Sequence, residues 1–204
     1  VNLQNHRSVL PVSVKTRIGY DKVEIEDWIT EVLRAKPANI TIHGRTLKQM
    51  YQGEANWEAL RLAGDIIRDF NSTLPSPAKI TYIANGDISS PEIAKARLAE
   101  TSADGLYIGR GAYGDPWIFQ RVKEYLSGTK VEFAEPDIYE KARVALGHAH
   151  LHYEIKGASG FVQMRKHLAW YLRGFPGAAE VRTNLMQTNS PDEVEEVLRR
   201  HSLL

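Results

Sequence analysis

The sequence contains no cysteine among its 204 residues. A disulfide framework, a thiolate metal site and a catalytic cysteine are therefore excluded from this chain. It also has no apolar run close to the roughly 18 residues that a membrane-spanning helix needs. The first residues, VNLQNHRSVLPV, contain no hydrophobic segment of the secretory type. We therefore expect a cytoplasmic protein that is not associated with a membrane.

Neither sign of charge is in clear excess, because the formal net charge is only +1. The chain as a whole therefore predicts no affinity for an acidic partner, and any nucleic-acid surface has to be local. An apolar content of 43% is ordinary for a soluble globular protein. The length allows one good core or one and a half domains.

Four short runs rich in β-branched residues predict strands, and each is followed by a segment with helical periodicity. The strand segments are 11–17, 38–45, 79–87 and 104–110, and the helical segments are 24–35, 56–70, 90–101 and 115–126. Ser90-Pro91 and Asp115-Pro116 are typical helix starts. One face of the first helix carries Ile25, Trp28, Ile29, Val32 and Leu33. Strands alternating with helices predict βαβ units and a parallel sheet.

Two α/β architectures fit this alternation: an open doubly wound sheet, or part of a (β/α)₈ TIM barrel. Each predicted strand ends in a polar or glycine cluster: Lys15 and Arg17, His43-Gly44-Arg45, Asn85-Gly86-Asp87, and Gly109-Arg110. Functional groups at the carboxyl ends of consecutive strands are typical of the top face of a barrel. A doubly wound sheet places its phosphate site mainly after the first strand. We therefore predict half of a barrel, since a full one takes about 250 residues.

The segment 127–137 is a Gly-, Pro- and acid-bearing connection, and no strand pattern follows it. Segments 138–156, 160–175 and 190–204 predict helices, the last starting at Ser190-Pro191. We therefore predict two domains, a partial barrel over 1–128 and a small all-α domain over 129–204.

The turn GRGAYG after the last predicted strand is typical of a phosphate site. Glycine lets backbone amides approach a ligand, and Arg110 offers a bidentate contact. The turn Asn85-Gly86-Asp87 ends the strand before it, and barrels bind phosphate after strands seven and eight. Either turn alone is also explained by a need for positive φ. Together, on consecutive strands, they favour phosphate binding.

Three further strand-end groups are candidates for binding a cofactor or substrate. Lys15 is either a solvated strand-end lysine or a partner for negative charge, such as that of a reduced flavin ring. Arg17 lies on the same face by the period of two. His43 is either a satisfied core histidine or a donor to a carbonyl. In the next loop, Arg45 and Tyr51 offer a charge and a stacking surface to RNA, or belong to a solvated loop.

The helical tail is locally basic, with seven cations and two acids between residues 141 and 182. Arg165, Lys166 and Arg173 interleave there with Trp170, Tyr171 and Phe175. We expect the aromatic side chains to pack the helices and the cations to face outward toward RNA. His148 and His152 have an i, i+4 spacing that also suits a metal, but we interpret them as solvated or RNA-facing and expect no metal site.

Taken together, PVSVKTRIGYD, ITIHGRTLKQMYQGEANW, IANGDISSP and YIGRGAYGDPWIF resemble, in order and spacing, the tRNA-dihydrouridine synthase family of bacterial type. RKHLAWYLRGFPGAAEVR resembles the signature of its helical C-terminal domain. The resemblance implies an FMN-binding (β/α)₈ barrel followed by a helical domain that grips tRNA. It implies reduction of uridine to 5,6-dihydrouridine in tRNA, with NADPH recharging the flavin.

By motif match, the resemblance implies cofactor binding by Lys15, His43, Asn85, Gly86, Asp87, Gly109 and Arg110. It places Arg17 near the flipped uracil. The substrate or RNA contacts that we predict are Arg17, Arg45, Tyr51, Arg165, Lys166 and Arg173.

Two family segments are missing: the N-x-G-C-P loop with the general-acid cysteine, and the APM-G-x-T segment of the first strand. We therefore interpret the chain as the C-terminal portion of such an enzyme, with its acid expected before Val1, no catalytic residue of its own and no independent activity. Two alternatives stay open. One is a flavin-dependent barrel oxidoreductase of a free pyrimidine or similar molecule, as dihydroorotate and dihydropyrimidine dehydrogenases are. The other is a non-catalytic RNA-binding fragment, or a half-barrel that pairs into a dimer.

Overall fold

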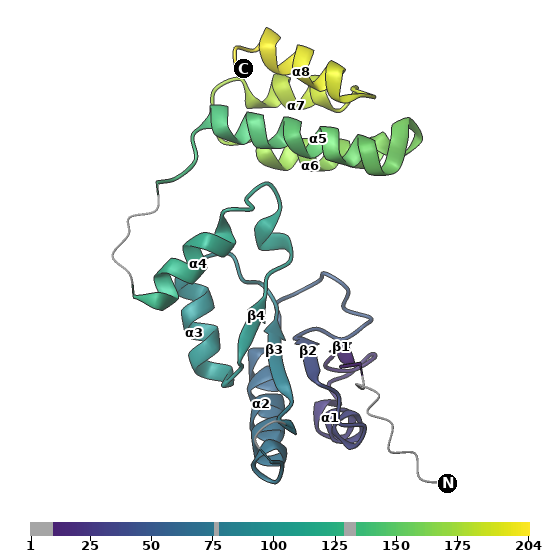
Figure 1. Cartoon of the computed structure of the whole chain (residues 1–204), viewed down its shortest axis with the longest axis vertical. Coiled ribbons are helices and arrows are strands. Elements are labelled where there is room, and N and C mark those ends of the chain that lie inside the picture. Colours follow the sequence, from purple (N-terminus) through teal and green to yellow (C-terminus); the bar gives the residue numbers. More distant parts are fainter. Residues whose placement is uncertain (1–9, 76–77, 129–133) are drawn as a thin grey trace. The chain divides into compact units, whose positions relative to one another are not determined.

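The computed structural model describes residues 10–75, 78–128 and 134–204 (Figure 1). The chain divides into two compact units, Val1–Arg110 and Gly111–Leu204. The first is an α/β unit and the second is helical. Helix α4 (Ile118–Ser127) therefore belongs to the second unit, whereas the predicted domain boundary lies after residue 128.

The first unit contains one parallel sheet in the order β1-β2-β3-β4. Its strands are β1 (Ser13–Arg17), β2 (Asn39–His43), β3 (Thr81–Asn85) and β4 (Gly105–Tyr107). Helices α1 (Ile25–Arg34), α2 (Trp57–Ser72) and α3 (Pro91–Thr101) connect them and follow one another in chain order (Figure 1). A strand order without reversal has no topological switch point, so it agrees with consecutive βα units of a (β/α)₈ barrel and not with a doubly wound sheet.

The two faces of the sheet differ in character. Ile40, Ile42, Tyr82 and Ala84 are buried on the helix-covered face, where the Tyr82 hydroxyl donates to the Leu60 carbonyl of α2 over 2.8 Å. Because side chains alternate along a strand, those at the intervening positions point to the other face. The strand register aligns these in two rows, Lys15-Thr41-Ile83-Gly105 and Arg17-His43-Asn85-Tyr107. The second row stands at the carboxyl ends of the strands, which is the end at which a barrel carries its site.

Local sequence explains where α3 begins but not where α4 begins. The Ser90 hydroxyl accepts from the Ile93 amide, with Pro91 at the first helical position, as predicted. The predicted start at Asp115-Pro116 is wrong, because α4 begins at Ile118. The Asp115 carboxylate pairs with the Arg121 guanidinium instead of capping the helix.

Helix α1 buries Ile25, Ile29 and Leu33, as its periodicity predicts. Trp28, on the same predicted face, is 46% exposed, and its indole N–H donates to the Thr16 hydroxyl over 2.7 Å. Thr16 belongs to β1, which is an edge strand of the sheet. The position of α1 beside this edge explains why the amphipathic pattern overestimates the burial of the tryptophan.

The second unit is built from α4 and from five later elements. These are α5 (Ile138–Gly160), η3 (Phe161–Met164), α6 (Arg165–Tyr171), α7 (Ala178–Leu185) and α8 (Pro191–Arg200). The core shared by the five later elements includes Ala145, Ala149, Phe161, Leu168, Leu185 and Leu198. The predicted helix over 160–175 is divided into η3 and α6, and α7 was not predicted. Within residues 10–75, 78–128 and 134–204, no helix combines the length and apolar character that a membrane span requires.

Candidate cofactor site

The carboxyl ends of the four strands form the candidate site. The Lys15 ammonium on β1 lies 5.5 Å from the centroid of the Tyr107 ring on β4, although β2 and β3 stand between them. Neighbouring strands are about 4.8 Å apart, so β1 and β4 would be roughly 14 Å apart in a flat sheet. The two long side chains therefore converge over β2 and β3, as they would on the concave inner side of a barrel sheet. Tyr107 was not predicted as a site residue, although its alternation with Gly105 in β4 places it on this face.

The pKa values of His43 and Lys15, on the concave face, are both lowered. Burial, followed by the positive charges of Arg17, Lys15 and Arg45, lowers the pKa of His43 to about 4, and the charge of Asp87 opposes this only in part. The His43 imidazole is therefore neutral near pH 7 and can donate or accept a hydrogen bond without carrying a charge. Burial, and then the charge of Arg17, also lower the pKa of Lys15.

Arg17 turns toward the loop that follows β2. Its guanidinium Nη1 donates to the Thr46 carbonyl over 2.7 Å and to the Met50 carbonyl over 3.3 Å. Arg17 thus joins the loop to the end of β1. Its predicted contact with a flipped uracil stays a prediction. A cleft of about 730 Å³ begins beside it and is lined by residues of β1, α1 and the loop, Lys15, Arg17, Tyr20, Trp28 and Leu47 among them.

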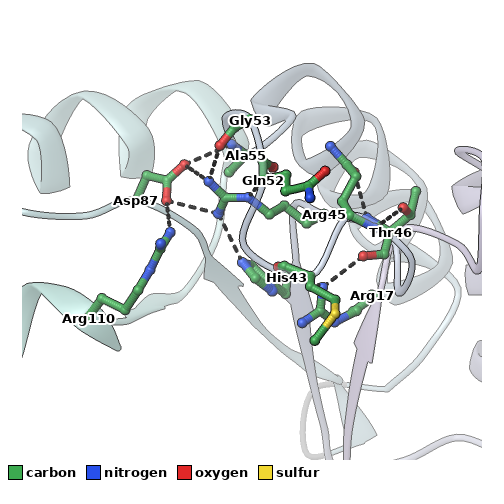
Figure 2. A network of polar contacts seen from close by, with 11 residues as sticks. Arg17, His43, Arg45, Thr46, Gln52, Gly53, Ala55, Asp87 and Arg110 are labelled. Atoms are coloured by element: carbon green, nitrogen blue, oxygen red, sulfur yellow. Dashed lines mark hydrogen bonds and ion pairs between the residues drawn. The ribbon is translucent and has the colours of Figure 1, made fainter.

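Asp87, at the end of β3, is the centre of a polar network (Figure 2). Its carboxylate accepts two hydrogen bonds from the Arg45 guanidinium, at 2.9 and 2.6 Å, and one from Arg110 at 2.8 Å. It also accepts from the Ala55 amide at 2.8 Å. Burial alone raises the pKa of Asp87, but the hydrogen bonds from Arg45 and Ala55 and the two guanidinium charges bring that pKa below its usual value. The carboxylate is therefore ionised at neutral pH.

Arg45 and Tyr51, both predicted to contact RNA, lie in different environments. The Arg45 side chain is only 2% exposed. Tyr51 is 63% exposed, and the Arg110 guanidinium lies 5.2 Å from its ring centroid. Tyr51 is therefore accessible to a ligand, whereas Arg45 holds surrounding protein groups. Asn85 also has an internal partner, since its amide donates to the Tyr107 carbonyl over 2.8 Å.

The glycines of the two predicted phosphate turns have different roles. A Cβ atom added to Gly109 would meet no atom within 4 Å, so open space lies beside its backbone. A Cβ on Gly86 would lie 2.5 Å from the Cβ of Ala55, so Gly86 is explained by close packing of two loops. A Cβ on Gly114 would lie 2.2 Å from the Trp170 carbonyl oxygen. Gly109 is thus the glycine whose surroundings suit a ligand.

A second cleft, of about 680 Å³, adjoins the Asp87 network. It is lined by Arg45, Tyr51, Trp57, Asp87, Arg97 and Arg110 among others. Trp57 and Arg97 were not predicted as site residues, and the Arg97 guanidinium lies 4.8 Å from the Trp57 ring centroid. One carboxylate between Arg45 and Arg110 leaves a net positive charge. With the open space at Gly109, this charge fits the phosphate of a cofactor such as FMN.

The predicted RNA-binding cations of the helical unit also differ in exposure. Lys166 and Arg173 are exposed. Arg165 is partly buried and donates to the Thr188 carbonyl over 2.8 Å and to the Asn189 side chain over 2.7 Å, so it ties α6 to the loop before α8.

The aromatic side chains of this unit largely pack it, as expected. Tyr171 lies in the core and Phe175 packs against it. Trp170 stacks on Tyr113 at 4.1 Å between ring centroids. Among the residues that the structure describes, no group of three or more His, Asp or Glu side chains is arranged to hold a metal ion.

Successive parallel βα units with functional side chains at the carboxyl ends of the strands define a protein of the (β/α)₈-barrel class. Within that class, the chain belongs to the dihydrouridine synthase family, because the sequence profile described as Dihydrouridine synthase (Dus) matches residues 2–203.

Curated relatives are similar over most of the chain. A probable tRNA-dihydrouridine synthase 1 of Synechocystis sp. is 37% identical over 93% of this chain and 50% of its own length. A probable tRNA-dihydrouridine synthase of Rickettsia typhi is 35% identical over 92% of this chain and 54% of its own. The tRNA-dihydrouridine synthase B of Vibrio parahaemolyticus is 38% identical over 85% and 51%. The chain thus spans about half the length of the relatives it matches.

Proposed function

We propose that this chain is the part of a tRNA-dihydrouridine synthase that holds one side of an FMN site and a tRNA-binding surface. The complete enzyme reduces a uridine of tRNA to 5,6-dihydrouridine and uses NADPH as the reductant. Family membership and the names of the relatives support the reaction. The observation that carries the cofactor assignment is the concave strand-end face, on which Lys15 and Tyr107 approach each other.

The residues of this chain supply charge, orientation and shape to that reaction. When bound, FMN supplies the hydride chemistry. Lys15 places a positive charge on the concave face, and neutral His43 offers hydrogen bonds there. The backbone at Gly109 and the guanidinium of Arg110 hold the phosphate. The ring of Tyr51 provides an exposed stacking surface beside Arg110.

The proton that completes reduction of the uracil ring comes from outside this sequence, which contains no cysteine. The family resemblance assigns that role to a cysteine in an N-x-G-C-P loop. The uridine has to leave its stack to reach the site. We assign the grip on the RNA backbone to the exposed Lys166 and Arg173 of the helical unit.

A chimera tests this proposal. The first half of the Vibrio parahaemolyticus synthase B is joined to this chain and expressed in cells that lack dihydrouridine synthases, and dihydrouridine in their tRNA is measured. We expect dihydrouridine in the chimera and about a tenfold or greater loss in Lys15→Met, because the charge on the concave face is removed.

The matched control is Lys48→Met, since Lys48 also lies over a tyrosine ring, 5.4 Å from the centroid of Tyr20, but outside the strand ends. A folded, FMN-loaded chimera that reduces free pyrimidines and leaves tRNA unmodified would contradict the tRNA assignment. It would support the alternative of a small-molecule oxidoreductase.

A further inference from the structure

We propose that Asp87 and Arg45 are positioning residues, which fix the loop between β2 and α2 and orient Arg110 toward a phosphate group, and that neither contacts cofactor or RNA itself. The identity of the phosphate as that of FMN rests on the proposed function. These roles differ from those that the sequence predicts, which are a cofactor contact for Asp87 and an RNA contact for Arg45.

The hydrogen-bonding capacity of Asp87 is filled by the protein. A carboxylate offers about four acceptor positions. Oδ1 accepts from Arg45 Nη1 at 2.9 Å and from Arg110 Nη2 at 2.8 Å. Oδ2 accepts from Arg45 Nη2 at 2.6 Å and from the Ala55 amide at 2.8 Å. A ribityl hydroxyl would therefore have to displace one of these donors to reach Asp87.

The donors of Arg45 are used in the same way. A guanidinium has five N–H donors. Two of them go to Asp87, and two go to the carbonyls of Gln52 at 3.2 Å and Gly53 at 2.6 Å. The fifth faces the His43 Nε2 atom at 3.4 Å. Because the side chain is also only 2% exposed, Arg45 is closed to RNA.

Arg110 differs from Arg45 in both exposure and engagement. Its side chain is 45% exposed, and its ion pair with Asp87 runs through Nη2 at 2.8 Å. It follows Gly109, beside which an added Cβ would meet no atom within 4 Å. Figure 2 shows Arg110 and Arg45 approaching the Asp87 carboxylate from different directions. Asp87 thus holds one guanidinium inside the protein and a second one at the open turn.

The backbone is shaped to allow this arrangement. Asp87 has a φ of +43°, in the left-handed region that aspartate tolerates better than most residues. Gly86 before it lets the turn approach Ala55, where a Cβ would come within 2.5 Å of the Ala55 Cβ atom. That approach brings the Ala55 amide to the carboxylate. Asp87 therefore also fixes the entry to α2, whose N-cap is Asn56.

Charge alone and positioning predict opposite effects of Asp87→Asn on a phosphate ligand. Removal of a negative charge near a phosphate would strengthen FMN binding if Asp87 acted only through its charge. If Asp87 orients Arg110, the loss of its charge-assisted bonds weakens FMN binding by about tenfold. Riboflavin, which lacks the phosphate, is then affected less than about twofold.

The experiment measures the affinity of the 204-residue chain for FMN and for riboflavin by flavin fluorescence, in the wild type, Asp87→Asn, Arg45→Lys and the matched control Glu54→Gln. Glu54 lines the same cleft but takes no part in the network. We expect the FMN-to-riboflavin affinity ratio to fall about tenfold in the first two variants and to stay unchanged in the control. A merely structural role would lower thermal stability and leave the ratio unchanged.

Amide hydrogen exchange of residues 46–55 provides a readout without flavin. We expect faster exchange of this segment in Asp87→Asn and Arg45→Lys, with α2 unchanged. If the wild type does not bind FMN, the FMN assignment of this chain fails, and exchange alone decides the positioning role. Unchanged exchange, an unchanged affinity ratio in a chain that binds FMN, or tighter FMN binding in Asp87→Asn would overturn the inference.

Discussion

The Lys15 ammonium lies 5.5 Å from the centroid of the Tyr107 ring, across the full width of a four-stranded parallel sheet. Burial lowers the pKa of this lysine, and the charge of Arg17 lowers it further. A lysine in such a position is stabilised by a negatively charged partner on the concave face. The aromatic ring opposite supplies part of that compensation through its electron-rich face.

Replacement of this lysine should weaken the binding of FMN and riboflavin equally. Lys15→Met removes charge near the isoalloxazine ring, which both ligands contain, and we expect a loss of about tenfold for each. Lys48→Met, over the ring of Tyr20, should change neither affinity. A loss confined to FMN would show that Lys15 contacts the phosphate and would contradict its place beside the ring.

The histidine on the same face should make stability depend on pH. Its pKa is about 4 in the folded state against an ordinary value of 6.5. Since the unfolded chain binds the proton first as the pH falls, the contribution of His43 is fully present above about pH 6.5 and is lost between about 6.5 and 4. His43→Gln should flatten the pH dependence of the free energy of unfolding in this window. An NMR titration of His43 with a midpoint near 6.5 would contradict the account.

Gly114 should be required by packing, in contrast to Gly128. Both have positive φ, +71° and +68°, but only a Cβ at Gly114 meets other atoms, at 2.2 Å from the Trp170 carbonyl oxygen. Gly128→Ala should cost about 1 kcal/mol through its backbone conformation alone. Gly114→Ala should cost clearly more, measured by urea unfolding of the helical unit. Equal losses would show that the backbone conformation, and not Trp170, explains the glycine.

Two exposed cations of the helical unit should contribute to RNA binding through charge. Lys166→Gln with Arg173→Gln should weaken tRNA binding and reduce the salt slope by about 0.7 to 0.9 per lost phosphate contact. Arg199→Gln is the control, because Arg199 already pairs with Glu195 at 2.6 Å. Filter binding of tRNA over a range of salt concentrations gives both slopes. A double variant with the wild-type slope would exclude these two residues from the RNA surface.

Features that depend on neighbours in sequence were predictable. The four strands, the Ser90 cap of α3 and the Ser190 cap of α8 follow from periodicity and local hydrogen bonds. Asp115 resembles such a cap, yet its partner Arg121 lies six residues further on and removes it from that role. The short α7 is absent from the predicted helices, although Ala178, Val181 and Leu185 mark its buried side.

Features that depend on tertiary contacts were not predictable. The sequence predicts that Arg45 is an exposed cation in a loop. Its burial is explained only by its contact with Asp87, which lies 42 residues later in the chain. Tyr107 is not among the predicted site residues, because only the fold shows that its ring on β4 lies beside Lys15 on β1. The sequence is enough to predict which residues end the strands. Which of these residues contact one another can be seen only in the folded structure.

The most direct test of the strand-end site compares FMN and riboflavin affinities in the wild type and Arg110→Gln by fluorescence titration. The account predicts that the wild type binds FMN more tightly than riboflavin and that Arg110→Gln removes this preference while riboflavin binding is retained. A wild type without preference for FMN, or a variant that keeps the preference, would contradict the assignment of the phosphate to the Gly109-Arg110 turn.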